Sequence, residues 1–352
     1  MASSEKRRAR KRVTIREVAA KAGVSITTVS HAINEKGSVA RATRARVLEA
    51  ASQLGYQADA LAKGLRNNRI GVVGLVMRPL DALGSYRLTG VDYFTRLAGA
   101  TAVEALDHGF CLMLMRDLSA NSVPAIAFAV DGYIVADPIE NDPVIELLRE
   151  RDIPVVSVGR DIARSDFVDW VGADESVDID TVLSHLHEQG ASSITLVTGT
   201  DRNAWNLDTE AAYVNWAGTH RMVPRVIRQG ESSGEEGGRA VAKELLAEPE
   251  SLPDAVYCLT GRHAAGLVAA FQEAGVRVPD AVMVVAGSDS EQTRNGTPPI
   301  TSVDLRPELV ARAAVELFVR RLEQDQGCGP SRVQSMLLVR TSTQRGVALG
   351  GR

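Results

Sequence analysis

Cysteine is scarce in this 352-residue chain, which contains only Cys111, Cys258 and Cys328. The three are widely spaced, form no CxxC pair and have no histidine cluster beside them. The sequence therefore offers neither a disulfide framework nor a zinc-site pattern. We expect buried thiols in a reducing cytoplasm and no bound metal.

Long apolar segments are also missing. No run approaches the roughly 18 apolar residues that a membrane-spanning helix needs, and no apolar stretch follows the charged N-terminal region. The sequence thus predicts neither membrane insertion nor secretion.

Motifs of several enzyme classes are absent too. The chain has no GxxxxGK[ST] phosphate loop, no HExxH metalloprotease motif and no GxGxxG after a strand-like segment. His185 and His187 are two positions apart on one expected helix and point to different sides, so they cannot share a metal ion. We expect no catalytic residue and no cofactor, and catalysis is the poorer hypothesis.

The most informative segment lies near the N-terminus. Thr14 and Glu17 have the spacing of a capping box, which predicts a helix beginning at Ile15. Gly23 can end that helix in the left-handed conformation, and Ser25 can cap a second helix. Two short helices joined by a glycine turn are typical of a helix-turn-helix.

The second of these helices has two different faces. Val29, Ala32 and Ile33 are expected to point inward. The residues expected to point elsewhere are Ile26, Thr27, Thr28, Ser30, His31 and Asn34. Hydroxyls, amides and one isoleucine suit the major groove of DNA, although a solvated face on an ordinary helical hairpin is the alternative. The basic run at residues 6–12 favours DNA.

A third helix is expected at about residues 41–54, with Val47, Leu48 and Ala51 inward and Gly55 as its stop. Residues 56–66 have some helical periodicity but contain Gly64, which costs about 1 kcal/mol relative to alanine. We expect this segment to be a weak helix that forms only when something holds it.

Charge separates the two parts of the chain. Residues 1–69 contain 15 Lys and Arg and 5 Asp and Glu, so their formal charge is +10, while the remainder carries −14. An acidic body repels DNA phosphates and leaves DNA binding to the basic part, with an affinity that falls steeply as salt rises.

The remaining residues alternate between strand-like and helix-like patterns, which predicts parallel sheets with helices on both faces. Two such series in tandem imply two lobes with a ligand site between them. The expected strands are residues 70–77, 111–115, 132–136, 154–158, 193–198, 255–259 and 282–286. The expected helices are residues 94–108, 142–151, 176–188, 208–220, 235–247 and 263–273.

Residues 14–34, together with Val39, Thr43, the Leu54-Gly55-Tyr56 sequence and Leu65, resemble the headpiece and hinge of the lactose/galactose repressor (LacI/GalR) family. This resemblance implies that Ile26, Thr27 and His31 contact bases, and that Leu65 is wedged into a central base step of the minor groove. The other DNA contacts that it implies are Thr14, Ser25, Thr28, Ser30, Asn34, Thr43, Tyr56 and Ala62.

Both the headpiece and the hinge depart from the family pattern. Ala58 replaces a frequent proline, and His31 stands where many members have arginine. We expect a looser hinge, in which residues 59–66 become helical only on the operator.

Residues 131–135, 275–280 and 286–289 resemble the effector domain of the same family, which is similar to periplasmic sugar-binding proteins. The resemblance implies chain crossings between lobes near 172, 300 and 330, and a last strand at 333–341. The resulting divisions are a basic arm (1–12), a helix-turn-helix domain (13–57), a hinge (58–69) and a two-lobed domain (70–352), with an N-lobe of 70–172 and 301–328 and a C-lobe of 173–300 and 329–352.

Two acids match family positions beside the effector cleft. Asp289 lies where an acid often accepts hydrogen bonds from the ligand, and Asp174 lies where Asp or Asn is common, although either could be an ordinary loop cap. The candidate effector contacts are Tyr86, Arg116, Arg160, Asp174, Trp205 and Asp289. Aromatic residues among them could stack on a sugar or nucleoside-like ring.

The sequence as a whole predicts a cytoplasmic, nucleoid-associated repressor that binds a pseudo-palindromic operator as a homodimer and responds to a small-molecule effector. No leucine heptads follow Thr341, which favours a dimer over a tetramer. The alternatives are a solute-binding protein and an architectural protein that binds DNA without sequence preference.

Overall fold

The computed structural model describes residues 13–33, 39–54, 56, 69–77, 92–119, 123–324 and 327–345. The chain divides into two compact units, residues 1–70 and residues 71–352. The basic arm, residues 58–68 of the expected hinge with Ala62 and Leu65, and the candidate contacts Asn34 and Tyr86 lie outside the described residues.

The first unit contains three helices, α1 (Ile15–Ala22), α2 (Ile26–Ile33) and α3 (Arg41–Leu54). The expected caps are confirmed, because Thr14 and Glu17 form a capping box and Gly23 is left-handed at φ 64°. The helices share one small core. Leu48 was wrongly predicted to point inward: Ala50 takes that place in the core, and Leu48 is 49% exposed.

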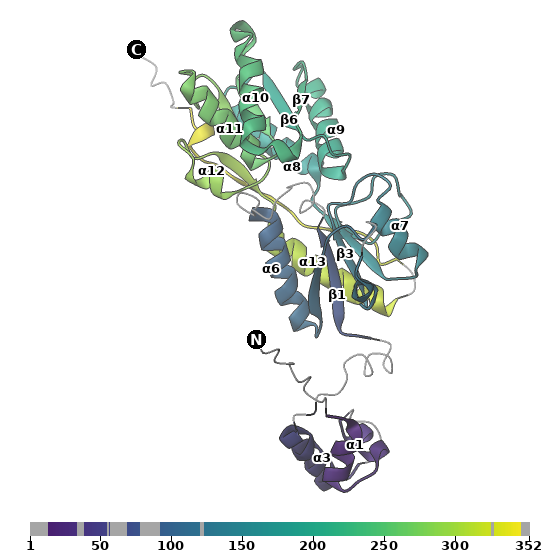
Figure 1. Cartoon of the computed structure of the whole chain (residues 1–352). Coiled ribbons are helices and arrows are strands. Elements are labelled where there is room, and N and C mark those ends of the chain that lie inside the picture. The colour runs from purple at the N-terminus through teal and green to yellow at the C-terminus, as the bar shows by residue number, and fades with distance from the viewer. Residues whose placement is uncertain are drawn as a thin grey trace, which may run out of the picture. The chain divides into compact units, whose positions relative to one another are not determined.

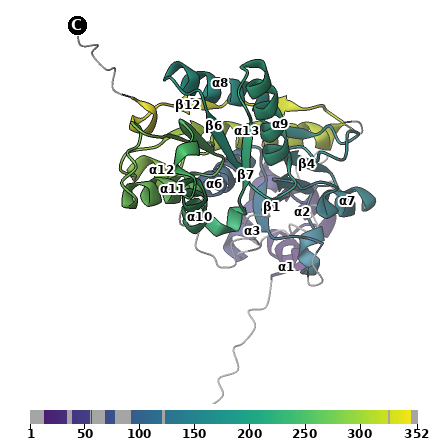
Figure 2. The ribbon, with the colours of Figure 1, turned by 90° about the horizontal axis from the view of Figure 1, so that it is seen from above.

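The second unit contains two six-stranded sheets, one in each lobe (Figures 1 and 2). The N-lobe sheet has the order β11-β5-β4-β3-β1-β2, and its pairs are parallel. Its strands are β1 (Val72–Met77), β2 (Cys111–Met115), β3 (Gly132–Ala136), β4 (Val155–Val158), β5 (Trp170–Gly172) and β11 (Ser331–Arg332).

Helices cover both faces of this sheet, as predicted. Leu75 and Met77 pack in the core with α6 (Asp92–Asp107) and α13 (Pro307–Glu323), whereas Val76 packs on the opposite face with α7 (Pro143–Glu150) and the 3₁₀ turn η1 (Ala125–Phe128). The alternation follows from the two-residue period of a strand.

The C-lobe sheet has the order β12-β10-β9-β8-β6-β7, and β12 is antiparallel to β10. One face is covered by α8 and α9, and the other by α10 and α11. The strands are β6 (Ile194–Thr198), β7 (Arg225–Arg228), β8 (Ala255–Cys258), β9 (Met283–Ala286), β10 (Thr301–Asp304) and β12 (Met336–Leu338); the helices are α8 (Glu175–Glu188), α9 (Ala204–Thr219), α10 (Gly234–Leu246), α11 (Gly261–Glu273) and the short α12 (Glu291–Asn295).

The chain crosses between the lobes after β5, after β10 and after β11. The predicted return to the N-lobe at 301 is too early, because Thr301 and Ser302 pair with β9 and keep β10 in the C-lobe sheet. The predicted start of the last C-lobe segment at 329 is also too early, since Ser331 and Arg332 pair with β5. The last strand is shorter than the expected 333–341.

Two further findings bear on the expectations from composition. Cys258 is buried as predicted, but Cys111 is exposed on the edge strand β2 and Cys328 is half-buried. In the described part of the chain, every helix is too short or too polar to cross a bilayer.

Candidate functional site

The exposed face of α2 is the first candidate site. Ile26 is 44% exposed, and Thr27 and His31 are also exposed. Val29 and Ala32 on the other side are buried in the core. An apolar side chain standing in solvent between polar neighbours costs hydration free energy, so this face is suited to a partner that offers both apolar and polar contacts.

The caps of this unit fix the orientation of that face. The Thr28 backbone N–H donates to Ser25 Oγ at 3.1 Å, and the two hydroxyl oxygens are 2.8 Å apart. Thr14 accepts from the Glu17 N–H at 3.4 Å and donates its own N–H to that carboxylate at 2.6 Å. These side chains therefore hold helix ends in addition to any contact with DNA.

The remaining sequence-predicted DNA contacts that the structure describes surround this face only in part. Ser30 and Thr43 are half-buried. Tyr56 is half-buried as well and packs against the three-helix core, so its ring has a structural role.

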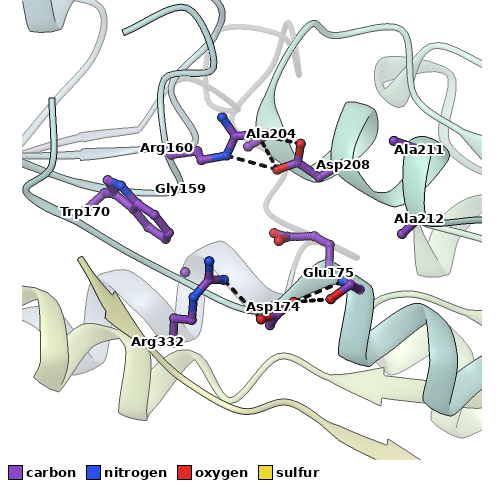
Figure 3. A pocket seen from close by; sticks show the side chains of 12 residues that line it. Gly159, Arg160, Trp170, Asp174, Glu175, Ala204, Asp208, Ala211, Ala212 and Arg332 are labelled. Carbon is purple, nitrogen blue, oxygen red and sulfur yellow. Dashed lines mark hydrogen bonds and ion pairs between the residues drawn. The ribbon is translucent and has the colours of Figure 1, made fainter. Parts of the chain in front are cut away.

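A cavity of about 280 Å³ between the lobes is the second candidate site. It lies beside the first crossover, where β4 and β5 of the N-lobe meet the N-terminal ends of α8 and α9 (Figure 3). Its charged and aromatic lining consists of Arg160, Trp170, Asp174, Glu175, Asp208 and Arg332. Of the six predicted effector contacts, Arg160 and Asp174 are brought together here.

Both arginines of the cavity are paired. Arg160, which follows β4, reaches Asp208 on α9 with Nη2 2.6 Å from Oδ1 and Nε 3.1 Å from Oδ2. This bidentate pair joins the lobes. Arg332 lies 3.6 Å from Asp174, and its guanidinium carbon is 5.3 Å from the centre of the Trp170 ring. Asp174 is also the N-cap of α8, and the Ser176 hydroxyl lowers its pKa.

Glu175 is the third acid of the cavity. Its carboxylate points between the two ion pairs (Figure 3). Burial raises its pKa to about 7, and repulsion from Asp208 and Asp178 adds to the effect of burial. A carboxylate that titrates near neutral pH is common at functional sites.

Other contacts hold the lobes together outside the cavity. The Asn203 amide donates to Asp137 at 3.0 Å, and the Glu140 N–H donates to the Arg202 carbonyl at 2.8 Å. On the other side, Arg294 of α12 pairs with Asp92 of α6. The lobes are therefore closed at the N-terminal end of α9.

Three predicted effector contacts lie outside the cavity. Asp289 is 7% exposed, and its oxygens accept from Ser302, Arg294 and Thr293. Burial opposes its charge, but one hydroxyl and two guanidinium groups together lower its pKa, so it is a structural acid in this conformation. Trp205 packs against the C-lobe core, and Arg116 is exposed after β2.

Sequence reasoning missed Trp170, Glu175, Asp208 and Arg332. Glu175 could have been predicted from the sequence, because it directly follows the expected cap Asp174. The other three had no local signal: β5 and β11 are only three and two residues long, and Asp208 sits 48 positions from its partner Arg160.

One enzyme-like pattern was also missed. Residues 230–234 read GESSG, which matches GxSxG and lies between β7 and α10. Ser232 at its centre does not have the positive φ of a strained nucleophile turn. Its neighbour Ser233 contacts His263 (Oγ to Nε2, 3.2 Å) but donates to the Gly230 carbonyl at 2.5 Å. The pattern therefore serves to shape the loop.

Metal ligands do not gather anywhere in the described ranges, where no group of three His, Cys, Asp or Glu could hold an ion. His185 contacts Thr343 and His187 contacts the Ala191 carbonyl, so the two side chains point to different partners.

Comparison with known proteins matches two parts of the chain. Residues 14–59 match the bacterial regulatory proteins of the lacI family, and residues 183–343 match a periplasmic binding protein-like domain. The HTH-type transcriptional repressor PurR of Aliivibrio fischeri strain ES114 is 29% identical over 322 residues, which cover 88% of this chain and 92% of that repressor. PurR of Haemophilus influenzae strain KW20 is 26% identical over 332 residues, covering 89% and 93%.

Solved structures share the fold. The Lac repressor dimer bound to operator and the anti-inducer ONPF has a TM-score of 0.80 at 21% identity, over 95% of this chain and 100% of that one. The transcriptional regulator CelR in complex with cellobiose has a TM-score of 0.68 at 25% identity, over 94% and 100%. The chain is therefore a DNA-binding transcriptional regulator that joins a segment matching the lacI family of bacterial regulatory proteins to a periplasmic-binding-protein-like effector domain.

Proposed function

We propose that this protein is a cytoplasmic, nucleoid-associated repressor that binds a pseudo-palindromic operator as a homodimer. A small molecule that binds between the lobes lowers or raises its affinity for the operator. The observation that carries the proposal is the exposed face of α2, with Ile26, Thr27 and His31 outward on a self-contained three-helix core.

In this proposal α2 lies in the major groove. Ile26 contacts a thymine methyl, and Thr27 and His31 contact base edges. The backbone contacts are Thr14, Ser25, Thr28, Ser30, Asn34, Thr43 and Tyr56. Ala62 and Leu65 of the hinge enter the minor groove, where an apolar wedge kinks the duplex.

An exposed apolar surface on the N-lobe supports the homodimer. Val103 and Leu106 are 59% and 63% exposed one turn apart on α6, and Leu114 is 50% exposed on the adjacent edge strand β2. Leu112 faces the core beneath α6, so the two-residue period of a strand places Leu114 on the same side of the sheet. A second copy would bury this surface and would present two α2 helices to two half-sites.

The interlobe cavity supports control by an effector. A ligand there meets Arg160 and Trp170 from the N-lobe and Asp208 from the C-lobe, so binding depends on the lobe angle. A ligand shifts this equilibrium only by its differential affinity for the two lobe arrangements.

Selection from a randomised pool of DNA duplexes by the full-length protein tests the proposal. We expect enrichment of one two-fold symmetric sequence that competes with excess random DNA, at a preference of about 10³-fold or more. Equal binding to all duplexes would favour an architectural protein. Absence of DNA binding would favour a solute-binding protein, and turnover of any ligand would favour an enzyme.

A further inference from the structure

The charges that line the interlobe cavity do not balance. Arg160 and Arg332 supply two positive charges, while Asp174, Glu175 and Asp208 supply three negative charges when ionised. Each arginine already lies against one carboxylate, Arg160 against Asp208 and Arg332 against Asp174. One acid is therefore left without a cation of its own.

Glu175 is that acid. It is the first residue of α8, directly after the cap Asp174, and its side chain points into the cavity (Figure 3). Within the described part of the chain, no side chain forms a hydrogen bond or ion pair with its carboxylate, which accepts from its own backbone N–H. Removing a carboxylate from water without a partner is costly, so a cation that entered the cavity would be favoured there.

We propose that the interlobe cavity binds a small metabolite through a protonated primary amine that lies between Glu175 and Asp208. The proposal rests on the effector role proposed for this cavity and names the chemical class of the ligand. An ammonium group has three donors and can serve both carboxylates.

The other residues that line the cavity indicate what the rest of the ligand is like. Ala204, Ala211 and Ala212 of α9 form a wall of methyl groups, and Trp170 contributes an aromatic ring from the other lobe. A volume of about 280 Å³ is at the lower end for ligand pockets. The ligand is thus small, with an amine at one end and an apolar or ring portion against α9.

An anionic ligand fits the cavity less well. It would have to displace Asp208 from Arg160 or Asp174 from Arg332, and it would lie near the unpaired Glu175. Like charges in a partly enclosed site repel each other strongly.

Amine binding has a direct mechanical consequence. Asp208 is the C-lobe partner of Arg160, so an ammonium group that takes up one oxygen of Asp208 weakens the ion pair between the lobes. The cavity therefore couples recognition of a cation to the lobe angle.

Methylammonium chloride, the smallest probe of this class, tests the proposal on the full-length protein. Saturation-transfer NMR would follow its methyl signal at constant ionic strength, with sodium acetate as the anionic counterpart. We expect saturable methylammonium binding that is tighter at pH 8 than at pH 6, because Glu175 must be ionised to bind a cation. The charged groups around Glu175 are Arg160, Arg332, Asp174, Asp178 and Asp208. Glu175→Gln should weaken it about tenfold, and Glu188→Gln, exposed at the far end of α8, should not.

Equal binding to wild type and Glu175→Gln, absence of saturable binding, or saturation by acetate instead of methylammonium would each overturn the proposal. The duplex selection is independent of these outcomes, because it requires no ligand. If one operator is selected but methylammonium does not bind, the amine proposal is refuted and the repressor proposal stands. If methylammonium binds but no operator is selected, the repressor proposal is refuted.

Discussion

Arg160 and Asp208 form the interlobe contact with the most complete geometry in the cavity, with three N–O distances between 2.6 and 3.1 Å. Their side chains are 37% and 29% exposed, so solvent screens the pair. Its contribution to the free energy of unfolding is therefore small, and because the pair joins the two lobes we expect it to act mainly on the angle between them.

Asp208→Asn should therefore change the angle between the lobes while changing the free energy of unfolding only slightly. We expect the free energy of unfolding to fall by only about 0.5–1 kcal/mol, while small-angle scattering of the full-length protein reports a more open effector domain. Asp166→Asn is the control, because it breaks the exposed pair of Asp166 with Arg149 inside the N-lobe. Equal scattering curves for the two variants would show that the Arg160–Asp208 pair does not hold the lobes.

Ile26→Ala should weaken binding to the selected operator about tenfold and leave random-DNA binding nearly unchanged, because base contacts rather than phosphate contacts are lost. Leu48→Ala is a matched control, since Leu48 is a similarly exposed apolar residue on α3. Electrophoretic mobility shifts with both duplexes measure the effect. A similar loss on both duplexes would contradict base recognition by Ile26.

Val29→Ala on the same helix should act differently. Val29 is fully buried, so the variant should destabilise the first unit by about 2 kcal/mol through lost apolar burial. Circular dichroism of the full-length protein would detect this as melting of the first unit at a lower temperature than in wild type. An unchanged melt would mean that the three-helix core does not depend on Val29.

The features that were predicted best from the sequence are those that depend on residues close together in the chain. The capping box of Thr14 and Glu17 and the left-handed Gly23 depend on neighbours only a few positions away, and the structure has them. Periodicity placed most of the longer strands but missed β7 and β10. It also missed β5 and β11, which are too short to carry a pattern; β5 pairs with the edge of β4, and β11 pairs with the edge of β5.

Tertiary choices were less predictable. Leu48 and Ala50 are both plausible core residues of α3, but Ala50 is buried with Val47 in the shared core of the three helices, whereas Leu48 is exposed. The cavity was found only through Arg160 and Asp174. Asp289 matched the effector pattern, yet Ser302 and two arginines occupy its oxygens.

Leu106→Glu should convert the protein to a monomer if the surface of α6 and β2 is the dimer interface, because a charge would be buried against a second copy. Analytical ultracentrifugation measures the change. Val223→Glu is the control, since Val223 is 90% exposed on the C-lobe. A Leu106→Glu variant that remains dimeric would place the interface elsewhere.

The free energy of unfolding should depend on pH because of Glu175. Its pKa rises from 4.5 in the unfolded chain to about 7 in the folded protein, so between these values the folded state binds more protons than the unfolded state. Stability from this group is complete below about pH 4.5 and is lost as the pH rises toward 7.

Glu175→Gln removes this dependence. Urea unfolding from pH 4.5 to 8 should show the variant gaining stability relative to wild type through the window and levelling off above pH 7, by about 3 kcal/mol in total. Glu188→Gln should follow the wild-type curve. A constant difference between wild type and Glu175→Gln across the window would mean that Glu175 is solvated in the folded protein, and the cavity would then have no unpaired acid to offer a cation.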